Sequence, residues 1–296
     1  MQRVFVDAPL SALLLLLCIP IAVASPLEDA VRLYQARQYN EVSDVLIPVA
    51  VAGNPDEAEA SRWLGKAARK QNQAGDAVRW LEKAVGLKPR EASYWVDLGD
   101  AYGLMAKQAS VFEKLDWARK CDRALGRAVE LAPADFAARS ALVDFCLEAP
   151  EMAGGGRKRA LAEARALKEL NVSGGAVLEA LLFEKEKRWD ESLAVLRDAI
   201  GRMPEDYVLL YTLGRTAVLA GRTESDAKAA LEKCLGLEPP AGFPGHGAVW
   251  YRLGDLSRLN GDREAARVGY ETALRLDPAL EPAKQALDGL DAAADR

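Results

Sequence analysis

Residues 250–278 have the sequence WYRLGDLSRLNGDREAARVGYETALRLDP and contain the clearest copy of a pattern that recurs along the chain. Trp250, Leu253 and Gly254 are spaced three and four residues apart, so they share one face of a predicted first helix. A second predicted helix has a similar spacing at Ala266, Tyr270 and Ala273. Residues 260–262, Asn-Gly-Asp, interrupt the pattern and turn the chain back. The stretch therefore predicts a helical hairpin.

Prolines mark the ends of such hairpins, because a proline cannot continue a helix but suits the first turn of the next one. The intervals between them are 34, 44, 71, 35 and 39 residues, and they are Pro55, Pro89, Pro133, Pro204, Pro239 and Pro278. A period near 34 residues is typical of an array of small helical units rather than of one globular core. The interval of 71 residues indicates a unit at about 136–170 whose closing proline is missing.

This pattern resembles the tetratricopeptide repeat, whose W-x-x-L-G-x-x-Y … A-x-x-x-F … A … P framework has clear matches in two units. The matching residues are Trp95, Leu98, Gly99 and Tyr102, and then Trp250, Leu253 and Gly254. The resemblance extends over residues 25–280. It implies an all-α fold, a right-handed α-solenoid of about seven helical hairpins around a concave groove. We expect residues 281–296 to form a capping helix and a tail.

The first 24 residues differ in kind from the rest. Arg3 precedes an apolar run that ends in Ala22-Val23-Ala24, which is typical of a cleaved secretory signal peptide. The run is too short for a membrane span and contains Pro20, so no stable membrane insertion is expected after cleavage. Exported arrays of the repeat that the chain resembles fit the bacterial periplasm, and we expect the protein there.

The composition suits a soluble globular chain, with 28% charged and 50% hydrophobic residues. A formal net charge of −5 argues against nucleic-acid binding, which needs a basic face. The only histidine, His246, lies in the loop 239–247, and no partner for a metal site or a catalytic relay can be named. We therefore expect no enzyme activity, no metal and no cofactor.

Three cysteines follow the predicted signal peptide. Cys146 and Cys234 occupy positions where the repeat carries small or apolar residues, so both are predicted to be buried. A disulfide between Cys121 and Cys146 remains an alternative in an oxidising compartment.

Two departures from the repeat are candidate functional features. The loop 149–158 could bind an anion through Gly154, Gly155, Gly156, Arg157 and Lys158, because N–H groups at a helix start attract negative charge. The favoured interpretation is a long connection that lets the superhelix change direction. The Ala-Pro … Gly-Gly-Gly loop also resembles a group of exported, uncharacterised bacterial proteins with this repeat.

The second departure is a lengthened hairpin. Its first helix is predicted at about 92–108, and a capping box at Ser110 and Glu113 predicts a second helix at about 111–131. The extension, near 104–117, carries Leu104, Met105, Val111, Phe112, Leu115 and Trp117. Some of these must cover each other, and any that stay exposed would form a surface for a partner or for self-association.

The concave groove is the default binding surface of this repeat family. The first-helix positions expected to face it carry Arg62, Lys66, Arg69, Asp100, Asp144, Tyr211, Arg215, Tyr251, Asp255 and Arg258. The groove is thus predicted to be basic at its amino-terminal end, acidic in the middle and aromatic with arginine at the far end. The three basic residues loosely resemble a clamp for a peptide carboxylate, although charges on a helix usually form a solvated face.

The leading hypothesis is a non-catalytic periplasmic scaffold for protein–protein interaction that binds an extended peptide or protein segment in its groove. The main alternative is an accessory protein that binds a small anion or a glycan, through the loop 149–158 or through the Tyr211 and Tyr251 end. A hydrolase with an unrecognised site is a third and weaker alternative. The partner and the oligomeric state are not specified by the sequence.

Overall fold

The structure is a computed structural model that describes residues 25–292, and these residues form fifteen α-helices and one short 3-10 helix, with no strand. The first helices of the hairpins are α1 (Pro26–Gln35), α3 (Glu57–Lys70), α5 (Ala92–Gln108), α7 (Phe136–Glu148), α9 (Val172–Lys185), α11 (Tyr207–Leu219) and α13 (His246–Leu259). The second helices are α2 (Tyr39–Leu46), α4 (Ala74–Leu87), α6 (Val111–Leu131), α8 (Arg157–Leu170), α10 (Trp189–Arg202), α12 (Ser225–Cys234) and α14 (Arg263–Leu276). The 3-10 helix η1 (Glu151–Ala153) lies between α7 and α8, and α15 (Glu281–Ala292) follows the last hairpin.

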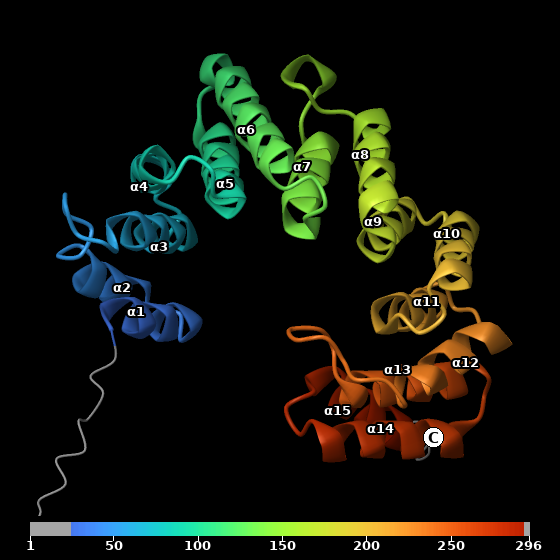
Figure 1. The fold of residues 1–296 in the computed structure, drawn as a ribbon. Coiled ribbons are helices and arrows are strands. Elements are labelled where there is room, and N and C mark those ends of the chain that lie inside the picture. Colours follow the sequence, from blue (N-terminus) through green and yellow to red (C-terminus); the bar gives the residue numbers. More distant parts are fainter. Residues whose placement is uncertain (1–24, 293–296) are drawn as a thin grey trace, which may run out of the picture.

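The hairpins follow one another along an arc. The first helices line its inner side and the second helices its outer side (Figure 1). Each first helix contacts the next first helix along the chain, from α1 through to α13. The prediction of an all-α solenoid is confirmed. The predicted signal peptide, residues 1–24, and the last four residues lie outside the described part of the chain.

A glycine in the first helix allows the two helices of a hairpin to approach closely. A Cβ atom at Gly65, Gly99 or Gly214 would lie 2.4, 2.5 or 2.2 Å from the nearest side-chain carbon of Leu81, Leu125 or Leu231, respectively. These three leucines are at most 2% exposed, so each fills the space that its glycine leaves. The Leu-Gly pattern of the sequence thus has a direct packing cause.

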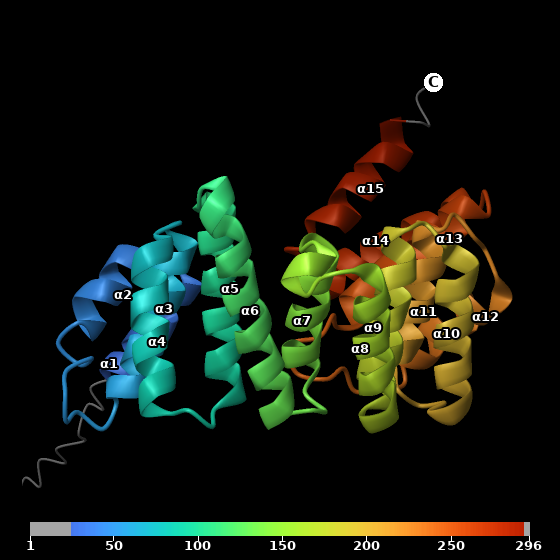
Figure 2. The same cartoon turned by 90° about the horizontal axis from the view of Figure 1, so that it is seen from above.

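The hairpin formed by α5 and α6 is longer than its neighbours. The two helices have 17 and 21 residues, whereas α3 and α4 have 14 each. In Figure 2, the tip of this hairpin extends further than the ends of the adjacent hairpins. Ser110 is the N-cap residue of α6, as expected, but its hydroxyl pairs with Glu113 at 2.7 Å and caps no backbone N–H group. The predicted capping box is therefore not formed.

The remaining sequence predictions concern cysteines and membrane insertion. Cys146 and Cys234 are buried, as predicted, and Cys121 is buried as well. All three are free, so the alternative of a Cys121–Cys146 disulfide is not realised in the structure. Between Ser25 and Ala292, none of the helices has both the length and the apolar character needed to cross a membrane.

Candidate functional site

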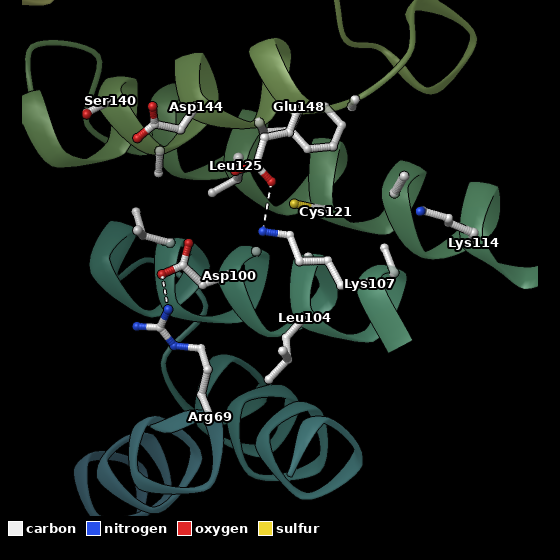
Figure 3. A pocket seen from close by; sticks show the side chains of 18 of the residues that line it. Arg69, Asp100, Leu104, Lys107, Lys114, Cys121, Leu125, Ser140, Asp144 and Glu148 are labelled. Carbon is white, nitrogen blue, oxygen red and sulfur yellow. Dashed lines mark ion pairs between the residues drawn. The ribbon is translucent and has the colours of Figure 1, made fainter. Parts of the chain in front are cut away.

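A pocket of about 1010 Å³ lies between α5, α6 and α7 (Figure 3). Gly99, Gly103 and Leu104 line it from α5. Small residues of α7 face them across the pocket: Ala137, Ser140 and Ala141. The buried residues Cys121 and Leu125 form its floor from α6. Its volume is at the upper end of the range for ligand pockets, roughly 300–1,000 Å³.

The two glycines of α5 have different surroundings. Gly99 packs against Leu125, as described above. At Gly103 a Cβ atom would meet only the Sγ atom of Cys121, at 3.8 Å. A larger side chain at position 103 would therefore extend into free space, and the absence of one keeps the pocket open.

Charged side chains surround the apolar floor. Lys107 and Glu148 form an ion pair of 2.8 Å between α5 and α7, and both side chains are 64% exposed. Arg69 of α3 pairs with Asp100 of α5 at 2.8 Å. Burial raises the pKa of Asp100, and the charge of Arg69 opposes this rise only in part. The hydrogen bond and charge of Glu148 raise the pKa of Lys107, which keeps this lysine cationic.

Further pairs join the first helices along the array. Asp144 of α7 pairs with Lys185 of α9 at 2.9 Å, and Glu184 of α9 pairs with Arg215 of α11 at 2.8 Å. We call these cross-hairpin pairs the ion-pair ladder. It comprises Arg62–Asp97, Arg69–Asp100, Lys107–Glu148, Asp144–Lys185 and Glu184–Arg215. Within residues 25–292, the ladder runs without interruption from α3 to α11.

The basic amino-terminal end of the predicted groove is thus already engaged by the protein itself. Arg62 and Arg69 belong to the ladder. The ammonium group of Lys66 lies 4.0 Å from the ring centroid of Trp63, and burial lowers the pKa of Lys66. The three residues do line one side of α3, but two of them have carboxylate partners within the array.

At the carboxy-terminal end, the predicted groove residues differ in exposure. Tyr211 and Asp255 are only 6% and 4% exposed and offer almost no surface to a ligand. Asp255 accepts a hydrogen bond of 3.0 Å from the hydroxyl of Tyr270. Tyr251 is half-buried and Arg258 is exposed. Only these last two present substantial surface among the predicted residues of this end, since Arg215 pairs with Glu184.

The three N–H groups of Gly154, Gly155 and Gly156 in the loop 149–158 are already hydrogen-bonded within the protein. Those of Gly154 and Gly155 donate to the carbonyls of Glu151 and Pro150, and that of Gly156 donates to Cys146 at 2.6 Å. Arg157 pairs with Glu186 of α9, whereas Lys158 is exposed. A Cβ atom at Gly155 would lie 1.9 Å from the carbonyl oxygen of Ala149, so the close turn itself requires glycine. These contacts support the interpretation of a structural connection.

The loop 239–247 borders a second pocket of about 630 Å³, next to α11 and α13. The Nε2 atom of His246 donates a hydrogen bond of 2.9 Å to the carbonyl of Leu237, so this histidine anchors the start of α13. Among residues 25–292 there is no group of histidine, cysteine and carboxylate side chains that could hold a metal ion.

The sequence predicts only some of the residues that line the pocket between α5, α6 and α7. Arg69, Asp100 and Asp144 were expected to face a groove, and the structure places all three around the pocket. Gly103 and Ala141 carry no chemical signature that could identify them. The lengthened hairpin was the available signal, because Leu104, Val111 and Leu115 of its extension line the pocket.

Comparison with known proteins identifies the repeat. Family models of the tetratricopeptide repeat match residues 27–92 and 247–280. A tetratricopeptide-repeat protein of Parabacteroides merdae is 15% identical, the match covers 90% of this chain and 97% of that chain, and the TM-score is 0.49. A tetratricopeptide-repeat protein of Thermus thermophilus is 22% identical, with 65% and 97% covered and a TM-score of 0.47. PilW, a type IV pilus biogenesis factor, is 14% identical, with 78% and 98% covered and a TM-score of 0.46. A search of curated protein sequences finds no match.

Proposed function

We propose that this chain, which is a tetratricopeptide-repeat protein, is a non-catalytic scaffold that binds a segment of another protein on the inner side of its arc. The fold itself suggests protein–protein interaction. The observation that carries the finer proposal is the open pocket between α5, α6 and α7, which combines an apolar floor with a charged rim.

The pocket is suited to a large apolar side chain as an anchor. Cys121 and Leu125 offer a buried apolar surface, and buried anchors supply most of the binding energy in such contacts. Val96 and Lys107 both line the pocket, and they are eleven positions apart on one helix, a distance of about 17 Å. An extended segment of about five residues covers this length. Lys107, Glu148 and the other rim charges then lie beside its polar flanks.

The alternative of anion or glycan binding by the loop 149–158 has less support. The N–H groups of its three glycines already donate to carbonyl groups of the protein. A free ligand would have to compete with these bonds. The pocket needs no such rearrangement.

We also propose that the protein is exported to the periplasm. The support is the signal-like sequence of residues 1–24, with its Ala-Val-Ala site before Ser25. Fractionation of cells that express the full chain, with sequencing of the mature amino terminus, tests this proposal. A cytoplasmic protein that retains residues 1–24 would contradict it.

Binding to a displayed library of extended peptides, with residues 25–296 as bait, tests the scaffold function. For the selected peptides we expect Ser140→Leu, which narrows the pocket, to raise the Kd at least about tenfold. Ser257→Leu is the matched control, because both serines are half-buried on first helices and only Ser140 lines the pocket. If both variants bind the selected peptides with the same affinity as the unsubstituted protein, the binding site lies elsewhere on the array.

A further inference from the structure

The tip of the α5–α6 hairpin exposes two large apolar side chains. Val111 is 86% exposed and Phe112 is 93% exposed, the highest values among the exposed large hydrophobic residues of the described chain. They occupy the first turn of α6, where the hairpin extends beyond its neighbours (Figure 2). A phenylalanine in this position loses the stabilisation that burial would give.

The exposed tip borders the pocket. Val111, Lys114 and Leu115 line the pocket from the first turns of α6, and Phe112 lies between the first two of them in sequence. Met152 of η1, a segment that contacts α6, also lines the pocket and is 72% exposed. The turn of α6 that carries the exposed phenylalanine therefore borders the open apolar cavity.

We propose that the partner of this surface is a second copy of the same chain. Phe112 of each copy enters the pocket of the other, in a twofold arrangement. In a twofold contact the same patch meets itself, so a projection and a matching cavity must both belong to that patch. The tip and the pocket meet this condition, and the arrangement fills the cavity as it buries the phenylalanine.

The charges around the two features are complementary. Glu113 and Lys114 follow Phe112 in the first turns of α6, and both are exposed. Lys107 and Glu148 stand at the rim of the pocket with side chains 64% exposed. A twofold contact can place Lys114 opposite Glu148 and Glu113 opposite Lys107, so that the Lys107–Glu148 pair of each copy exchanges partners with residues of opposite charge in the other copy.

The contact is small, because it involves one hairpin tip and one pocket from each copy. Interfaces below about 1,200 Å² are typical of weak and transient association. We therefore expect a reversible dimer whose population rises with concentration. A partner segment bound in the pocket would compete with the second copy, but dimerisation itself does not depend on the proposed function.

Sedimentation velocity of residues 25–296 over a concentration series, without added peptide, tests the proposal. Phe112→Ser removes the projection, and Gly103→Leu fills the pocket. Each is expected to raise the dimer Kd at least about tenfold. Val268→Ser, at another exposed valine, and Gly126→Leu, at a helix glycine with no neighbour within 4 Å, are the matched controls and should leave the Kd unchanged.

Mixing the two variants gives the sharper test. The Gly103→Leu chain keeps its phenylalanine and the Phe112→Ser chain keeps its pocket, so the mixture should form a heterodimer more readily than either variant forms a homodimer. Glu148→Lys should also weaken the dimer, and Lys114→Glu in the same chain should restore it, which tests the contact without changing the helix glycine.

Several outcomes would overturn the proposal. One is a monomer at every concentration, and another is a dimer that Phe112→Ser leaves intact. A dimer weakened by Phe112→Ser but not by Gly103→Leu, with no recovery on mixing, would indicate that the tips meet each other and that the pocket is not involved. The scaffold function is tested separately, by peptide binding with Ser140→Leu, and its result is independent of each of these outcomes.

Discussion

The Nε atom of Arg62 lies 2.6 Å from the Oδ2 atom of Asp97, and this contact joins α3 to α5. The two side chains are 19% and 11% exposed, so the pair is largely removed from water. A basic residue expected to meet a ligand carboxylate thus already has a carboxylate partner in the next hairpin. The pair contributes to the junction between hairpins.

Replacement of Asp97 by alanine should destabilise this junction. It leaves the mostly buried charge of Arg62 with only the longer contact to Glu59, at 3.5 Å, which we expect to lower the free energy of unfolding by about 1–3 kcal/mol. Asp76→Ala is the control, because the Asp76–Arg79 pair is more than half exposed and should contribute about 0.5 kcal/mol or less. Urea denaturation followed by circular dichroism measures both. If Asp97→Ala and Asp76→Ala lower the free energy of unfolding equally, the burial of the Arg62–Asp97 pair has no energetic effect.

The close approach of hairpin helices should make Gly214 intolerant of any side chain. Gly214→Ala places a Cβ atom 2.2 Å from Leu231, and we expect a cost of about 1–3 kcal/mol from overpacking. Gly126→Ala should instead stabilise the protein by about 0.5–1 kcal/mol, because that helical position has free space. Thermal melting of the two variants should give shifts of opposite sign. A neutral Gly214→Ala would contradict the packing account of the Leu-Gly pattern.

Glu179 should link stability to acid pH. Burial acts to raise the pKa of Glu179, but hydrogen bonds from Lys168 at 2.6 Å and Arg165 at 2.8 Å outweigh it and hold the pKa below its usual value. Because the pKa of Glu179 is lower in the folded than in the unfolded protein, its carboxylate stabilises the fold at any pH above the pKa of the unfolded state. This stabilisation is lost as the pH falls through the pKa of the folded state.

Glu179→Gln should therefore be less stable than the unsubstituted protein near neutral pH, and the gap should narrow as the pH is lowered below about 4. Urea midpoints over a pH series measure this. A gap that stays constant or widens on acidification would contradict the assigned role.

The three cysteines should be unreactive in the folded protein. Burial raises the pKa of Cys121 and of Cys234 to about 12, and that of Cys146 to about 11, so almost no thiolate forms near neutral pH. With residues 25–296 we expect no modification by a thiol reagent under native conditions and modification of all three in denaturant. Rapid labelling of one thiol in the native protein would show that its helix opens locally.

The sequence predicts what depends on local spacing. Helix bounds of 92–108 and 111–131 follow from apolar periodicity and from Ser110, and α5 and α6 have these bounds. The missing proline of the fourth unit did not hide its helices, since α7 begins at Phe136 and α8 ends at Leu170. Such features arise within one hairpin.

The ion-pair ladder and the pocket depend instead on how neighbouring hairpins are offset. Arg62 and Asp97 are thirty-five positions apart, and no pattern within either helix shows that they meet. Asp255 is buried because the hairpin carries Tyr270 where others carry leucine, and the tyrosine hydroxyl needs an acceptor. The pocket arises between α5 and α7, which belong to different units, and the volume between them is not encoded at any one position.

The ion-pair ladder has a mechanical consequence. Because the pairs lie between first helices, on the inner side of the arc, a force that pulls the two ends apart stretches them directly. The Arg62–Asp97 pair is largely shielded from solvent, whereas Lys107–Glu148 and Asp144–Lys185 are more than half exposed and are weakened by salt. We therefore expect the resistance to such a force to differ along the array. Lys107, Asp144 and Glu148 of the exposed pairs line the pocket, so we expect a rise in ionic strength to weaken the junction between hairpins where a partner would bind.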